Sequence, residues 1–109
     1  LHRLPGDEIY HFYLGDPLEM LLLYPDGSSE VVILGQDLAA GQVPQLVIPA
    51  GVWQGSRVKA GGRFSLMGTT MAPGFIPSDY EGGEREILCR QYPTHMDLIN
   101  SLTRTENAQ

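Results

Sequence analysis

The sequence predicts an all-β domain, a barrel or sandwich of short strands with a short helical end. Two observations lead to this fold class. Segments rich in aromatic, β-branched and aliphatic residues recur at intervals of roughly 8–12 residues, with glycine and proline turn signals between them. Helix-like patterns occur only after residue 82. With 109 residues, 42% of them hydrophobic, the chain is long enough to build one such core.

Six strands are expected, each from its composition and from the turn signal that ends it. They cover residues 8–14, 18–24, 30–34, 46–48, 52–58 and 63–71. The turn signals after them contain Gly15-Asp16-Pro17, Pro25-Asp26-Gly27, Gly35, Pro49-Ala50-Gly51, Ala60-Gly61-Gly62 and Pro73-Gly74. Proline fixes φ and glycine accepts positive φ, so the chain is expected to reverse direction at these points.

Two helices are expected after the strands, over residues 84–92 and 93–104. In the second, Met96, Ile99 and Leu102 are spaced to share one side, and a proline suits its first turn. The predicted organisation is a barrel over residues 1–82 and a helical C-terminal segment over 83–109 that packs on it.

Charge and composition exclude several classes of partner. The formal net charge is −6, and the seven Lys and Arg residues are scattered, whereas nucleic-acid binding needs a basic stripe. No apolar run is long enough to cross a membrane, so no membrane partner is expected. Cys89 is the single cysteine, which fits a reducing compartment, and we expect a cytoplasmic protein. The chain begins at Leu1 rather than at a methionine, so the sequence leaves open whether another segment precedes it.

The expected strand over residues 8–14 carries chemistry on both faces. Because alternate residues of a strand share a face, Glu8, Tyr10 and Phe12 lie on one side. Ile9, His11 and Tyr13 lie on the other. Both faces are rich in apolar and aromatic groups, so both are expected to be covered, and a homodimer is predicted.

At this point the sequence resembles the cupin superfamily, and within it the Cupin_5 family, domain of unknown function 985. The stretch "HRLPGDEIYHFYLG" places His2, Leu4, Glu8 and Gly15 at the His, His, Glu and Gly positions of the first cupin motif. The stretch "PAGVWQGSRV" places Pro49 and Gly51 correctly in the second motif, with Gln54 at its His position and Val58 at its Asn position. The resemblance covers most of residues 2–76. It implies a double-stranded β-helix, or jelly-roll barrel, that forms dimers.

The resemblance raises the question of a metal, and the residues argue against one. A cupin metal site needs three imidazoles and one carboxylate, but Leu4 and Gln54 replace two of the imidazoles. No cofactor is therefore expected. If a divalent metal binds at all, it is held weakly by His2, Glu8 and Gln54. The favoured alternative is a hydrogen-bonded cluster of these three side chains inside the barrel.

Three functions stay open. The favoured one is binding of a small organic ligand inside the barrel. The ligand-binding candidates are His2, Glu8, Tyr10, Phe12, Val52 and Gln54, whereas Tyr80 lies outside both motifs.

The second is an isomerase or epimerase acting on a sugar-like substrate, by analogy with epimerases among the cupins. The catalytic candidates are then His2, Glu8 and Tyr10, with Tyr13 as an alternative acid, and Arg3, Arg57, Lys59 or Arg63 would grip a phosphate. The third is a structural cupin whose barrel is filled by its own side chains. The residues do not decide whether the chain is an enzyme.

Overall fold

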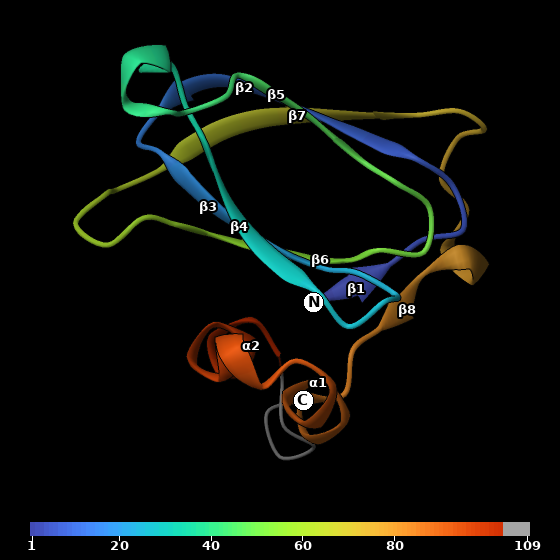
Figure 1. The fold of residues 1–109 in the computed structure, drawn as a ribbon. Helices are drawn as coiled ribbons and strands as arrows, with labels where there is room; N and C mark the ends of the chain where they lie inside the picture. Colours follow the sequence, from blue (N-terminus) through green and yellow to red (C-terminus); the bar gives the residue numbers. More distant parts are fainter. Residues whose placement is uncertain (104–109) are drawn as a thin grey trace.

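The computed structural model describes residues 1–103 and has three layers (Figure 1). The end of the second expected helix and the rest of the segment to residue 109 lie outside the described residues. Two antiparallel sheets face each other, and two short helices lie under one of them. The elements are β1 (His2–Arg3), β2 (Glu8–Gly15), β3 (Leu18–Leu23), β4 (Ser29–Leu34), η1 (Leu38–Ala40), β5 (Gln45–Ile48), β6 (Trp53–Val58), β7 (Ser65–Met71), η2 (Pro77–Asp79), β8 (Glu81–Gly82), α1 (Arg85–Gln91), η3 (Pro93–His95) and α2 (Met96–Leu102).

The larger sheet has the strand order β4-β3-β6-β1-β8, and the smaller sheet has the order β5-β2-β7. A bridge between Leu34 and Val43 connects the two sheets on the β4 and β5 side. The turns fall where the glycine and proline signals predict them, and Gly15, Gly27 and Gly51 adopt positive φ. The all-β fold class and the helical end are therefore as the sequence predicts.

The space between the sheets holds the first core. Phe12 from the smaller sheet packs with Met20 and Leu22 from the larger one. The other buried members of this cluster are Leu18, Leu34, Ile48 and Val52. The alternation within β2 and β3 explains the arrangement, because every second residue of each strand points into this space.

A second core lies between the larger sheet and the helices. Leu21, Leu23 and Trp53 point down from the sheet and pack on Leu88 and Ile99. Tyr92 joins the same cluster, and its hydroxyl donates a 2.6 Å hydrogen bond to the carbonyl of Tyr24. The helices are therefore a third layer that covers an apolar sheet face.

The predicted helix stripe is partly wrong. Ile99 is buried as expected, but Met96 is 48% exposed. Leu98, Ile99 and Leu102 pack into the second core, so the face of the helix that meets the sheet is centred on them and leaves Met96 at its edge. Gly55 on β6 allows α2 to pack close to the larger sheet, because a Cβ at this position would lie 3.0 Å from Leu1 and 3.2 Å from Leu102.

Two short strands were not predicted, and the expected strands differ from the observed ones by one residue at one end, or by two residues at the start of β7. β1 and β8 have two residues each, too few to show any periodicity. β7 begins at Ser65 rather than at residue 63, because the backbone N–H groups of Arg63 and Phe64 donate hydrogen bonds to the Asp16 carboxylate instead of to a neighbouring strand. Within residues 1–103, no helix is both long and apolar enough to cross a bilayer.

Candidate functional site

Glu8 and Gln54 form a buried polar pair between the two sheets. Glu8 opens β2 in the smaller sheet, and Gln54 is the second residue of β6 in the larger one. Gln54 Nε2 donates a 2.8 Å hydrogen bond to Glu8 Oε1. The two residues are only 7% and 2% exposed, respectively. This bond therefore joins the sheets across the interior, at a place where polar groups need partners.

The other end of the Gln54 amide has no partner. Its Oε1 is buried, and no donor reaches it from the residues that the structure describes. The orientation of the amide is fixed by chemistry, since a carboxylate only accepts hydrogen bonds and Nε2 must face it. An unpaired buried acceptor is uncommon and costs free energy unless something donates to it.

His2 lies beside this pair but is not bonded to it. In the register of β1 and β6 it stands directly opposite Gln54. Its half-buried ring stacks on Tyr80, with 5.1 Å between the ring centroids. Burial lowers the pKa of the His2 imidazole, and the nearby Glu8 carboxylate opposes this shift. The expected hydrogen-bonded cluster of three is thus a bonded pair with a neighbouring imidazole. Tyr80 touches the site even though it lies outside both motifs.

The remaining site candidates divide between the interior and the outside. Tyr10 is half-buried against the inner core, and burial, with the Glu8 carboxylate, raises the pKa of its hydroxyl far above its usual range. Phe12 and Val52 are themselves buried members of that core. Tyr13 lies on the opposite face of β2, next to a β-bulge, and is 56% exposed. The suggestion that Tyr13 could be a catalytic acid beside His2 is therefore wrong.

Solvent reaches the interior on the β6 and β7 side. Ser56 pairs with Met20, and Thr69 pairs with Tyr10, so both point between the sheets. Both are nevertheless exposed, whereas Leu34 on β4 and Ile48 on β5, which also face inward, are buried. The sequence reasoning missed Ser56, although the alternation of its strand could have indicated that it faces inward.

The basic side chains lie elsewhere. Arg3 forms a 2.8 Å ion pair with Glu81 and stands 4.4 Å from the centre of the Trp53 ring, on the side that faces the helices. Arg57 forms a 2.8 Å ion pair with Glu19 on the same side. Neither reaches Glu8 from the opposite face of the sheet. The idea that these two arginines grip a phosphate in the barrel is therefore wrong.

The side chains present do not fit a cupin metal. Leu4, at one His position, is 5% exposed and belongs to the apolar interior. Gln54, at another, turns its nitrogen toward the carboxylate. Among the side chains of residues 1–103, no group of three His, Cys, Asp or Glu lies close enough to hold a metal ion.

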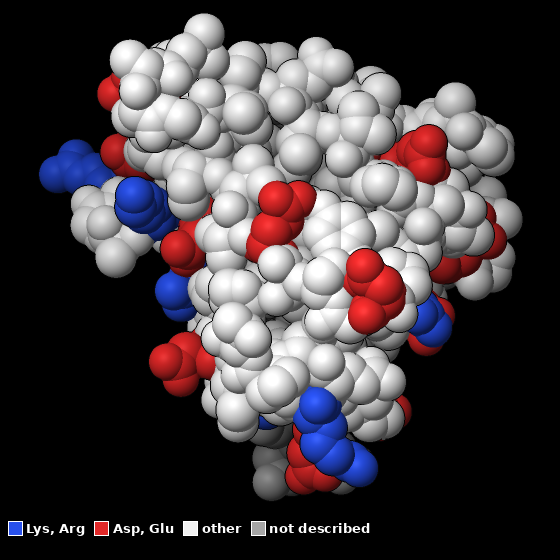
Figure 2. Space-filling model, in the orientation of Figure 1, with Lys and Arg blue, Asp and Glu red and all other residues white. Residues whose placement is uncertain are grey.

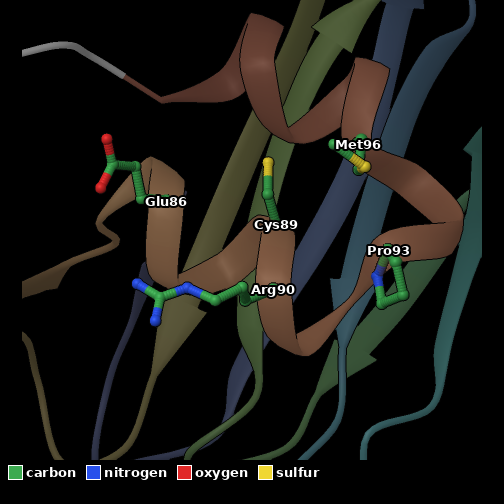
Figure 3. Close-up of a pocket in the computed structure, with 5 residues that line it drawn as sticks. All are labelled: Glu86, Cys89, Arg90, Pro93 and Met96. Carbon is green, nitrogen blue, oxygen red and sulfur yellow. The ribbon is translucent and has the colours of Figure 1, made fainter.

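A pocket also occurs on the helical layer (Figure 3). Glu86, Cys89, Arg90, Pro93 and Met96 line it. It is open to solvent and is separated from Glu8 and Gln54 by the larger sheet. The Cys89 thiol lies 3.7 Å from Asn100 Oδ1, and the pocket brings no second reactive group to it.

The sequence of residues 1–82 matches the family described as Cupin superfamily (DUF985). The chain belongs to this family. Both cupin motifs, with Glu8 and Gln54, lie within the matched region of this DUF985 chain.

Two solved structures show the same fold. A protein from Shewanella oneidensis is 39% identical, with a TM-score of 0.86 over 96% of this chain and 66% of that one. A hypothetical protein from Leishmania major is 28% identical, with a TM-score of 0.84 over 95% of this chain and 68% of that one. The chain thus spans 66% of the length of the Shewanella structure. No curated protein matches the sequence.

Proposed function

We propose that this DUF985 chain binds a small organic molecule between its two sheets, against Glu8 and Gln54. The observation that carries the proposal is the unpaired Gln54 Oε1, which is buried beside a carboxylate. A ligand with a hydrogen-bond donor would satisfy it. The exposure of Ser56 and Thr69 supplies a route inward, and the half-buried Tyr10 supplies an aromatic surface.

Neighbouring threonines of β7 give a matched test. Thr69 faces the interior and Thr70 faces outward, and both are exposed. Ring-containing and hydroxylated fragments should perturb the NMR signals of Gln54 and Tyr10. Thr69→Phe should block these perturbations, whereas Thr70→Phe should leave them in place. Absent perturbations would favour a structural cupin filled by its own side chains, and perturbations that survive Thr69→Phe would show that the fragments do not enter past Thr69.

Isomerase or epimerase activity is a second candidate function, favoured by the protonation states of two side chains. The lowered pKa keeps His2 neutral and able to accept a proton, and the raised pKa keeps Tyr10 protonated and able to donate one. Incubation with carbonyl sugars in D₂O should then incorporate deuterium next to the carbonyl group. Loss of this exchange in Tyr10→Phe, with folding intact, would support catalysis, and its absence in the wild-type protein would argue against it.

A further inference from the structure

Glu8 is a carboxylate inside the protein, and no Lys or Arg among residues 1–103 forms an ion pair with it. It is 7% exposed, and the donor that reaches it is the neutral amide of Gln54. The two ion pairs among the described residues, Arg3 with Glu81 and Arg57 with Glu19, both lie on the other side of the larger sheet. Buried carboxylates are usually paired with a cation, because an isolated charge loses its hydration.

Two acceptors therefore lie together at this place. Glu8 Oε1 accepts from Gln54, which leaves Glu8 Oε2 and Gln54 Oε1 to accept from something else. A metal ion is a poor candidate, because Ca²⁺ takes about 6–8 oxygen ligands and the pair offers only two free oxygens. A phosphate or carboxylate ligand is worse, since it would meet acceptors and a negative charge.

We infer that the group bound against Glu8 and Gln54 is a small organic cation with several N–H donors, of the ammonium, amidinium or guanidinium kind. This inference rests on the proposed function, because it names the chemistry of the ligand at the same site. One N–H donates to the free carboxylate oxygen and another to the orphaned amide oxygen, and the charge of the ligand pairs with the carboxylate. Such charge-assisted hydrogen bonds are about twice as strong as neutral ones.

The surroundings favour a flat cation. Tyr10 and His2 supply aromatic surface close to Glu8, and Tyr80 stacks on the His2 ring. Aromatic faces attract organic cations. The neutral state of His2 adds no positive charge that would repel such a ligand. The formal net charge of −6 attracts cations to the molecule in general, so the experiment must separate that effect from the site.

The test uses three probes with the same ring: benzamidine, which is a cation, benzamide, which is neutral, and benzoate, which is an anion. Each is titrated into the full chain, and the affinity is measured from the NMR signals of the Gln54 side-chain amide and of Tyr10. Benzamidine should bind at least about tenfold more tightly than the other two. Glu8→Gln should weaken the binding of benzamidine by about tenfold or more and leave the affinity for benzamide nearly unchanged.

Glu86→Gln is the matched control, because it removes the same charge from an exposed position on α1, which the larger sheet separates from Glu8. It should leave the affinity for benzamidine nearly unchanged. Equal weakening by Glu86→Gln, or equal binding of all three probes, would overturn the cation inference while the proposed binding function stands. If no probe moves the Gln54 or Tyr10 signals in the folded wild-type protein, both fail. Thermal unfolding of each variant checks that the fold is retained.

Discussion

The Glu8–Gln54 bond predicts a strong coupling between two substitutions. Methionine has nearly the shape of either side chain but cannot form the bond. Glu8→Met leaves both ends of the Gln54 amide unpaired in a position that is 2% exposed, at a cost of about 1–3 kcal/mol. Gln54→Met leaves the buried carboxylate without its donor, at a cost of about 1.5–3 kcal/mol, because the lost hydrogen bond involves a charge.

The double variant should cost much less than the sum of these two losses. With both polar groups replaced, nothing buried at this place is left unpaired, and the added apolar surface stabilises the interior. We expect the double variant to lie within about 1 kcal/mol of the wild type, so that the coupling energy is about 2 kcal/mol or more. Each single variant should lower the melting temperature by several degrees, given about 4–8 °C per kcal/mol for a domain of this size.

Urea unfolding followed by fluorescence measures these free energies. Trp53 is the single tryptophan of the chain and lies in the second core, so its emission reports global unfolding. The control is Arg3→Met with Glu81→Met, a pair of the same 2.8 Å length with side chains that are 41% and 54% exposed. That pair should couple by no more than about 1 kcal/mol. Additivity of the Glu8 and Gln54 variants within about 0.5 kcal/mol would refute the reasoning.

Three further outcomes are expected. The outer face of β2, β5 and β7 exposes apolar side chains and is nearly free of charge where Figure 2 shows it. The chain as a whole is acidic, so this is a face on which two copies would not repel each other. We therefore expect it to pair with a second copy over about 800 Å² per partner. Val47→Glu on this face should give a monomer in sedimentation equilibrium, whereas Leu38→Glu on η1 should not; a wild-type monomer at micromolar concentration would refute the pairing. Dialysis against a chelator should change neither the melting temperature nor the fold, and one tightly bound equivalent of iron, zinc or manganese would contradict this. The pKa of His2 is lowered in the folded protein, so the unfolded chain binds a proton at His2 more readily than the folded protein does. The free energy of unfolding is therefore highest above pH 6.5, where His2 is neutral in both states, and it decreases as the pH falls below that value. His2→Asn should therefore flatten the decline of unfolding free energy between about pH 7 and pH 5, and an unchanged slope would show that other groups cause the decline.

The sequence predicted most of the strands because glycine and proline mark their ends. The motif resemblance also placed Glu8 and Gln54 at related positions of one site. It could not predict how the three polar side chains pair, because that depends on the register of β1, a strand of two residues. The motif resemblance also placed Tyr80 outside the site, whereas β8 pairs with β1 and the Tyr80 ring stacks on His2. Contacts of such long sequence separation leave no local pattern to read.

The position of the helical layer has a consequence for synthesis of the chain. Leu21, Leu23 and Trp53 pack against Leu88 and Ile99, which are translated after all the long strands. Because the chain leaves the ribosome in sequence order, the strands can fold before the helices are available. Until the helices emerge, the sandwich lacks the layer that covers the larger sheet. The nascent chain then presents an apolar sheet face, and this is the stage at which we expect it to need a chaperone or to aggregate.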